Sequence, residues 1–468
     1  MNIWKTKTPA QIDDAAEHTQ LKKNLTAFDL AALGIGSVVG TGIFVATGQG
    51  AQLAGPGILL SFIIAAVTCG FCALTYSELA CMFPVAGSTY SYSYVAFGEV
   101  IAWIIGWDLM LEYLVAASAV ASGWSTTFIG LIQSAGVKLP KAFLTPPITT
   151  IDGKIVMSGG IIDVPAIVIT LLITWILYIG IRESAKINNI IVGVKVAVIV
   201  LFVVLGVRHV SLSNLTPMMP FGWKGVMAGA AIIFFAYIGF DAVSTAAEET
   251  KNPKRDVPLG LMLCLGVVIV LYVTVAFTLT GIVPYKQIDV GNALPAALAR
   301  IGIQWGGALV ATGAIIGMIS TLLVTLYGQI RIFMVMSRDG LLPPAFAKVH
   351  PKHRTPHICT WITGIATAAI AGLFPLPMII DLCNIGTLFA FILVSIGVIV
   401  LRKTRPEVER KFKTPGVPFT PLITVVFCFY LMYSLPKVTW IRFGLWLLAG
   451  LAIYFMYSVR HSKLQKTV

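Results

Sequence analysis

The stretch GIGSVVGTGIF occupies residues 34–44, inside an apolar run that extends from residue 28 to residue 51. A second apolar run, residues 223–247, carries FFAYIGFD at positions 234–241. Glycine costs about 1 kcal/mol relative to alanine inside a helix, so the glycines of the first stretch weaken its backbone locally. Both stretches predict membrane helices that are interrupted near their middle. For the first stretch alone, close helix packing through small residues is the competing interpretation.

The two interrupted runs lie five spans apart, which predicts an internal repeat. Matching breaks in two halves of a membrane protein are typical of inverted repeats that place a binding site at the breaks. Because each repeat would contain five spans, an odd number, the second copy would cross the membrane in the opposite orientation to the first. We therefore expect an N-terminal arm, a first repeat, a second inverted repeat and an added C-terminal pair of helices. The corresponding ranges are 1–24, 25–208, 209–401 and 402–468.

The composition supports an all-α integral membrane protein. Apolar residues make up 57% of the 468 residues and charged residues only 11%, whereas soluble domains have about 25% charged residues. A bilayer core needs about 20 apolar residues in a helix. Twelve runs meet or approach that length: 28–51, 57–81, 97–132, 163–181, 187–207, 223–247, 257–282, 305–336, 356–374, 378–401, 420–435 and 441–459.

The net charge of +13 orients the chain in the membrane. With the N-terminus inside, 22 of the 33 Lys and Arg residues fall in predicted cytoplasmic segments, and nine fall in outer segments or at the outer ends of the runs. This is the positive-inside pattern of a multi-pass protein of the cell membrane, with both termini cytoplasmic. It explains the excess charge without a nucleic acid partner, and the partners we expect are the amino-acid substrate and membrane lipid.

Lys195 lies eight or nine residues inside the run 187–207, between Val194 and Val196. A lysine at a helix centre costs about 2.5–3.5 kcal/mol on insertion scales, and such residues are usually functional. A buried amine can also lose its proton. Lys195 could therefore replace a bound metal cation or carry a proton, and a packed lysine bonded to carbonyls is the alternative.

The acidic residues of the spans are few. Asp108 and Glu112 are four residues apart and share a helix face. Asp241 follows the second break, where we expect it to hold the local geometry. Asp381 opens the run 378–401, and Arg331 is the least favoured candidate for substrate contact.

Enzymatic and metal-binding functions find little support. The sequence has no Walker loop, HExxH or GxSxG motif in a supporting context. His350, His353 and His357 belong to a predicted basic loop. Cys69 and Cys72 have C-x-x-C spacing but lie in an apolar run, where small buried residues are the simpler interpretation. We therefore predict a chain that is not an enzyme and holds neither metal nor organic cofactor.

Several motifs together resemble the amino acid–polyamine–organocation superfamily, and within it the bacterial relatives of the cationic amino acid transporters. They are GFDAVSTAAEE at 239–249, NP at 252–253, PLG at 258–260, GWD at 106–108, LEY at 111–113 and SRDG at 337–340, together with residues 34–44. The resemblance covers residues from about 25 to 460.

This resemblance implies a twelve-helix fold with inverted five-helix repeats, and an L-amino acid held at the two breaks. Ile35, Gly40, Thr41 and Gly42 would serve its carboxylate. Phe235, Ala236 and Ile238 would serve its amino group, with Phe235 as a gate. Lys195 matches a lysine that stands, in proton-coupled relatives, where sodium-coupled ones bind their ion, which favours protons as the coupling ion. The animal members carry further C-terminal spans that are not found here.

The side chain of the substrate is less well specified. Thr325 is small enough to leave room for a long cationic chain, and Glu112 is a candidate acceptor for it. We expect small neutral and cationic amino acids as substrates. Symport, exchange and facilitated diffusion all stay open, as do the direction of flux, the oligomeric state and a small accessory membrane subunit. A channel or a substrate sensor is a less favoured alternative.

Overall fold

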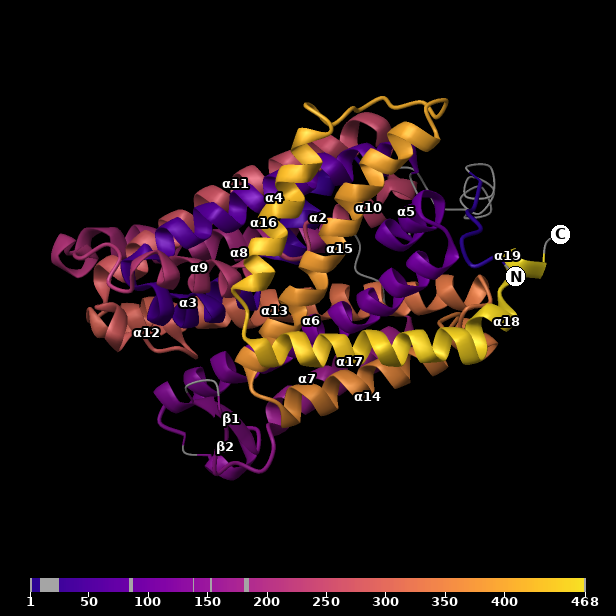
Figure 1. Cartoon of the computed structure of the whole chain (residues 1–468). Helices are drawn as coiled ribbons and strands as arrows, with labels where there is room; N and C mark the ends of the chain where they lie inside the picture. Colours follow the sequence, from indigo (N-terminus) through magenta and orange to yellow (C-terminus); the bar gives the residue numbers. More distant parts are fainter. Residues whose placement is uncertain are drawn as a thin grey trace.

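The computed structural model describes residues 2–8, 25–83, 87–137, 139–151, 154–180 and 185–466. Its architecture is almost entirely helical (Figure 1). The main helices are α2 Ala27–Val38, α3 Thr47–Ala54, α4 Ile58–Met82, α5 Ser88–Ala96, α6 Glu99–Ser134, α7 Val164–Ile179, α8 Ala185–Gly206, α9 Gly222–Ile233, α10 Ala242–Thr245, α11 Pro253–Ile282, α12 Ala293–Arg300, α13 Gln304–Arg338, α14 His357–Leu373, α15 Leu376–Thr404, α16 Phe419–Tyr433, α17 Lys437–Ile453, α18 Val459–His461 and α19 Lys463–Lys466.

The helices confirm the predicted membrane-spanning class. In the described part of the chain, eight helical segments are long and apolar enough to cross a membrane, and four shorter apolar helices accompany them. Each of the twelve predicted runs falls on one of these helices or on a pair that forms a broken span. The chain is therefore a multi-pass membrane protein.

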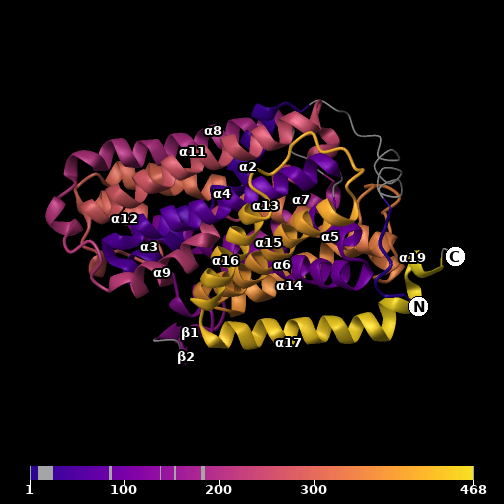
Figure 2. The same cartoon turned by 45° about the horizontal axis from the view of Figure 1, so that its top comes forward.

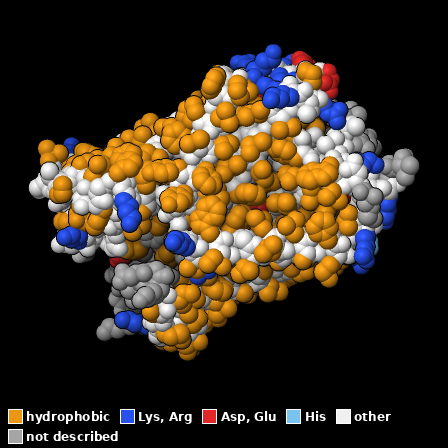
Figure 3. Space-filling view, viewed as in Figure 1, with side chains coloured by type: hydrophobic (Ala, Val, Ile, Leu, Met, Phe, Trp, Pro, Cys, Tyr) orange, Lys and Arg blue, Asp and Glu red, His pale blue; other side chains and the backbone are white. Residues whose placement is uncertain are grey.

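A broad apolar surface covers the face of the molecule shown in Figure 3, between its two ends. Large side chains on several helices are more than 60% exposed, among them Val270, Val426, Tyr433 and Leu445. We call this exposed apolar surface of the helices the apolar belt. Exposure of such a large apolar surface to water would be unfavourable, whereas the hydrocarbon region of a bilayer is a matching environment for it.

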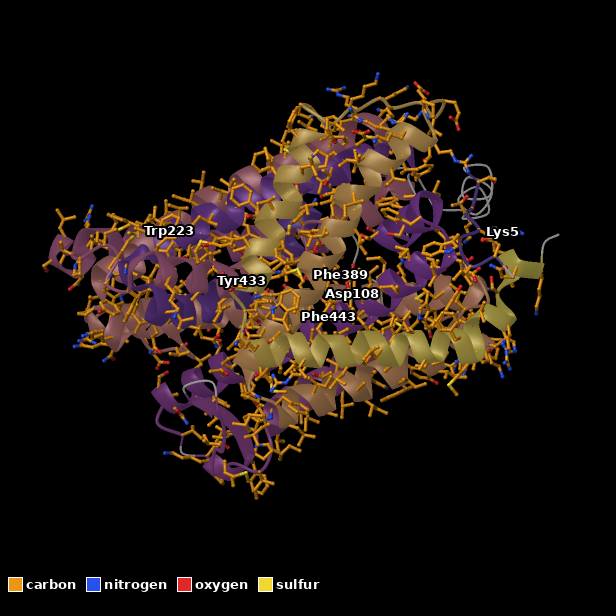
Figure 4. All side chains as sticks on the ribbon, viewed as in Figure 1. Lys5, Asp108, Trp223, Phe389, Tyr433 and Phe443 are labelled. Carbon is orange, nitrogen blue, oxygen red and sulfur yellow. The ribbon has the colours of Figure 1, made fainter. Side chains whose placement is uncertain are left out.

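Both ends of the chain lie on one side of the molecule, as Figures 1 and 2 show. The side chain of Gln465 accepts a hydrogen bond from the backbone N–H of Asn2 at 3.1 Å, and Lys7 pairs with Asp339 at 2.7 Å. We call this the terminal side. Lys5 marks it in Figure 4, and Trp223 marks the opposite side.

The first broken span begins at a capping box. Thr26 accepts from the Asp29 backbone N–H at 3.4 Å, and the Asp29 carboxylate accepts from the Thr26 N–H at 2.9 Å. The helix α2 ends at Val38, the chain bends at Gly40, and a π-helical turn over Gly42–Ala46 leads into α3. The predicted interruption is confirmed at the predicted glycines.

The second broken span consists of α9, a 3-10 turn over Phe234–Tyr237 and the short helix α10. Ile238 is extended, with ψ of 139°, and Gly239 follows with φ of 107°. Only glycine adopts that conformation readily, so the sequence ends the helix there.

Smaller elements connect the main helices. The loop between α6 and α7 contains the antiparallel pair β1 Ile148–Ile151 and β2 Lys154–Met157, whose turn at 152–153 lies outside the described residues. The short helix α12 packs on α13 and buries Leu294 and Leu298. A single 3-10 turn, Pro344–Ala347, follows α13. Residues 9–24 of the predicted N-terminal arm lie outside the described residues.

Candidate functional site

The two breaks meet at a direct backbone contact. A Cβ atom added at Gly42 would lie 2.3 Å from the Cα atom of Ala236. A Cβ atom added at Gly239 would lie 3.2 Å from the backbone carbon of Ser37. Because glycine alone permits this approach, the two interrupted helices form one site rather than two.

A cavity of about 370 Å³ opens beside this contact. That volume suits a small ligand, and its lining is mostly apolar with a few polar groups. Seven of the predicted substrate-site residues line it: Gly40, Thr41, Gly42, Glu112, Phe235, Ile238 and Thr325. Ile35, Ala236 and Lys195 lie behind the lining.

The first break presents backbone N–H groups. The helical turn that starts near Thr41 has, at its first residues, N–H groups without acceptors in their own helix. Such groups favour an anion. The Thr41 hydroxyl is already engaged by protein atoms and does not donate to an anion at the break. It lies 3.5 Å from the backbone oxygen of Val120 and 3.3 Å from the sulfur of Met318, and donates to these acceptors. Thr41 can therefore serve a carboxylate through its backbone, not through its side chain.

The second break offers carbonyl groups. The last carbonyls of a helix lack partners in that helix, and here the helix ends at Tyr237 before the extended Ile238. Phe235 lies in the lining and is 7% exposed. The site therefore has backbone hydrogen-bond donors at one break and backbone acceptors at the other. This arrangement suits a ligand that carries an anionic group at one end and a cationic group at the other.

Lys195 is fully buried and bonds to the first broken span. Its Nζ donates to the Gly36 backbone oxygen at 2.5 Å and to the Thr321 hydroxyl oxygen at 2.8 Å. The ammonium therefore occupies a position behind the break, where a bound cation would also find oxygen ligands. It reaches the cavity through Thr321, which lines it.

Thr321 is a site residue that the sequence reasoning missed. Its hydroxyl also lies 3.2 Å from the Gly36 oxygen and 3.4 Å from the Val39 oxygen. A signal was present, because Gly317, Thr321 and Thr325 follow each other at intervals of four and share one face of α13. A Cβ atom at Gly317 would come within 2.9 Å of the Lys195 side chain.

Three buried acidic residues lie near the cavity. Glu112 and Asp241 line it. Asp108 is fully buried one helical turn from Glu112, and its carboxylate oxygens have no hydrogen-bond partner among the described residues. One of them would lie 2.8 Å from a Cβ atom at Gly386 of α15. Figure 4 marks Asp108 in the region of Phe389 and Phe443, whose rings pack edge to face at 5.5 Å.

The cavity extends toward the terminal side. Its lining continues to Leu25, Glu249 and Arg354 at the helix ends there. Arg331 also lines it, lies 3.6 Å from Glu249 and stacks over the ring of Tyr327 at 4.7 Å. Arg331 therefore lies at the mouth and contacts an acid, not the centre of the cavity.

On the opposite side, the segment before α12 covers the first break. A Cβ atom at Gly48 would lie 2.9 Å from the Asp289 backbone oxygen, and Gln52 donates to the Ile288 oxygen at 3.3 Å. A Cβ atom at Gly130 of α6 would lie 2.7 Å from the Asn292 side chain. The cavity is therefore open toward one side of the molecule and closed toward the other.

The three histidines predicted in a basic loop cluster on the terminal side, but only His350 and His353 lie in the loop, since His357 is the first residue of α14. The ring of His350 lies 4.9 Å from that of His353 and 5.2 Å from that of His357. Partial burial, with the charges of His353, His357 and Lys352, lowers the pKa of His350. Within the described residues, no group of three His, Cys, Asp or Glu side chains is arranged to hold a metal ion.

Comparisons with known proteins give this geometry a family. The family described as amino acid permease matches residues 25–457. A branched-chain amino acid permease of Bacillus subtilis is 48% identical over 447 residues, 95% of each chain. A methylthioribose transporter of the same organism is 46% identical over 99% of this chain and 100% of its own. A vacuolar cationic amino acid transporter of Arabidopsis thaliana is 36% identical over 83% of this chain and 64% of its own.

Proposed function

The chain belongs to the amino acid permease family, and from that premise we propose that it is a secondary active amino-acid transporter working by alternating access. The observation that carries this proposal is one cavity shared by two helix breaks. The break at Gly40–Gly42 receives the substrate carboxylate on backbone N–H groups. The break at Phe235–Ile238 receives the amino group on backbone carbonyls, and Phe235 gates the pocket.

The substrates we propose are small neutral and cationic amino acids. The backbone groups at the two breaks would bind the carboxylate and amino group that all amino acids share. The side chain of the substrate is therefore selected by the other residues of the cavity lining. Glu112 and Asp241 supply carboxylates for a cationic chain, and Thr325 leaves space for it. The names of the relatives are mixed, specifying branched-chain amino acids, cationic amino acids or methylthioribose. Leucine therefore belongs in the test beside alanine and arginine.

We further propose that transport is coupled to protons through Lys195. Its bonds to Gly36 and Thr321 join the broken first span to α13. Loss of the lysine proton would weaken both bonds, because a neutral amine is the poorer donor. Proton release would then loosen the first break from α13 and favour a change of conformation. An exchanger or facilitator without proton coupling is the second candidate.

We place the chain in the cell membrane with the terminal side facing the cytoplasm, in accord with the distribution of Lys and Arg. The cavity then faces inward in this structure.

The test is uptake of radiolabelled alanine, leucine and arginine into proteoliposomes, with and without an inward proton gradient. The variants are Lys195→Ala and Lys195→Arg, because arginine keeps the charge but does not release its proton. We expect gradient-stimulated uptake in the wild type and its loss in both variants. Counterflow without a gradient checks that each variant still binds and moves substrate. Wild-type uptake that ignores the gradient would instead support an exchanger or facilitator.

A further inference from the structure

A basic cleft lies on the terminal side, at the start of α11. It has a volume of about 710 Å³, and four of its eight lining residues are cations: Lys251, Lys254, Arg255 and Lys411. Pro253, Pro258 and Phe412 are among the other walls. In Figure 3, Lys and Arg side chains gather at the upper edge of the molecule, where Figure 1 draws the α15–α16 loop.

The positive charge of this cleft is poorly balanced. The ion pair recorded there joins Lys254 to Glu409 at 3.2 Å, and the Glu409 side chain is 68% exposed. Such surface pairs contribute little. Asp256 is buried and does not line the cleft. Among the described residues, no ion pair joins Lys251, Arg255 or Lys411 to an acid, although Lys251 lies within electrostatic range of Asp29 at the start of α2. An anion between these side chains would relieve their mutual repulsion.

Apolar surface begins directly beside the cations. Leu259, one turn further along α11, is 41% exposed. At the start of α16, Phe419 is 71% exposed and Leu422 is 48% exposed. The cleft therefore lies at the edge of the apolar belt, where a ligand can place a charged group among the cations and a hydrocarbon chain along the helices. Basic pockets next to membrane helices on the cytoplasmic side suit anionic headgroups.

We infer that this cleft binds the phosphate of an anionic phospholipid headgroup. The ligand chemistry is a phosphate with an attached apolar chain. A free phosphate would neutralise the cations but would make no contact with the adjacent apolar surface. The cleft is separate from the transport cavity, whose lining shares none of its residues.

The position of the cleft connects the lipid to the broken spans. The Lys251 N–H donates to the Leu25 oxygen at 2.9 Å, and the Leu25 N–H donates to the Glu249 oxygen at 3.0 Å. Leu25 precedes α2, and Glu249 lies at the cavity mouth opposite Arg331. A headgroup held at Lys251 therefore stabilises the ends of both broken spans in the arrangement seen here.

The test uses the full chain purified in a neutral detergent. Native mass spectrometry counts bound phosphatidylglycerol, and thermal unfolding is followed during titration with phosphatidylglycerol, phosphatidylcholine or inorganic phosphate. The variant is the triple change Lys251→Gln, Arg255→Gln and Lys411→Gln. The matched control is Lys141→Gln, Lys224→Gln and Lys286→Gln, three cations of the opposite side. The single variant Lys411→Gln, in an exposed loop, replaces the triple variant if that one does not fold.

We expect phosphatidylglycerol to bind and to stabilise the wild type and the control, while phosphatidylcholine and phosphate do not. The triple variant should bind roughly 100-fold more weakly, because each Lys or Arg near an anionic lipid contributes about 1 kcal/mol. Equal binding by the triple variant and the control would overturn the proposal. Equal stabilisation by inorganic phosphate would overturn the lipid as the source. Neither readout requires transport, so they are independent of the proposed function.

Discussion

Gly42 lies where the two broken spans touch, and its missing side chain is what permits the contact. The nearest atom to an added Cβ is the Cα atom of Ala236, a backbone atom that cannot rotate away. A methyl group at this position would therefore push the two breaks apart. The displacement acts on the substrate site, because Gly42 lines the cavity.

We predict that Gly42→Ala abolishes most uptake while the protein still inserts and folds. The measurement is proteoliposome uptake of alanine at equal protein density. The matched control is Gly193→Ala in the middle of α8, where nothing lies within 4 Å of the added Cβ. There the higher helix propensity of alanine should stabilise the protein by up to about 1 kcal/mol. Normal uptake by Gly42→Ala would contradict the close contact of the two breaks.

Thr321 gives a second prediction at the residue scale. Thr321→Val keeps the shape but removes the oxygen that accepts from Lys195. A hydrogen bond to a charged group contributes about 1.5–3 kcal/mol, so we expect gradient-driven uptake to fall at least about tenfold. Thr321→Ser restores the hydroxyl and should retain most activity. If valine and serine behave alike in the uptake assay, Thr321 does not link Lys195 to the cavity.

At the scale of elements, a buried ion pair joins α4 to α15. The Glu78 carboxylate accepts two hydrogen bonds from Arg402, at 2.9 and 2.7 Å, and one from the Thr414 N–H at 2.7 Å. Arg410 lies 3.5 Å away. Glu78 is 1% exposed, so its charge depends on these partners. The contacts also anchor the loop between α15 and α16 to the end of α4.

We predict that Glu78→Gln destabilises the protein by about 3 kcal/mol, because it removes the buried carboxylate charge that faces the partly buried Arg402 and the buried Arg410. The apparent unfolding midpoint in detergent should fall clearly. Glu409→Gln serves as the control, since its exposed pair with Lys254 contributes about 0–1 kcal/mol. Similar midpoints for both variants would show that the buried pair does not anchor the loop.

For the whole molecule, the cavity is open toward the terminal side and covered on the opposite side by the segment before α12. The alternating access that we propose requires the reverse arrangement as well, with the mouth on the terminal side closed and the opposite side open. The seven cysteines are all buried, which leaves a low background for a thiol probe.

We predict that Leu33→Cys, in the cavity lining of α2, reacts with a membrane-impermeant thiol reagent applied from the terminal side. Substrate should slow the reaction by occupying the cavity. Ile63→Cys, an exposed position on α4 within the apolar belt, is the control that should react poorly. Inside-out and right-side-out vesicles distinguish the two directions. Labelling of Leu33→Cys exclusively from the opposite side would contradict an inward-facing cavity.

Sequence alone determined the class, the spans and the two breaks of this protein. Those features follow from local causes: the length of apolar runs and the cost of glycine within a helix. Five of the residues implied by the family resemblance line one cavity, and so do Glu112 and Thr325, which were proposed from their charge and size. Their roles in substrate binding stay predictions. The equivalence of the two five-helix halves stays a prediction.

Only the tertiary structure decided how these parts meet. It brought Gly42 against Ala236 and Lys195 against Gly36 and Thr321, through contacts between residues up to about 200 positions apart. It directed the Thr41 hydroxyl into the protein and gathered Lys251 and Lys411 around one cleft. Periodicity reports which face of a helix is buried, but not which partner covers it, since that depends on packing among distant segments.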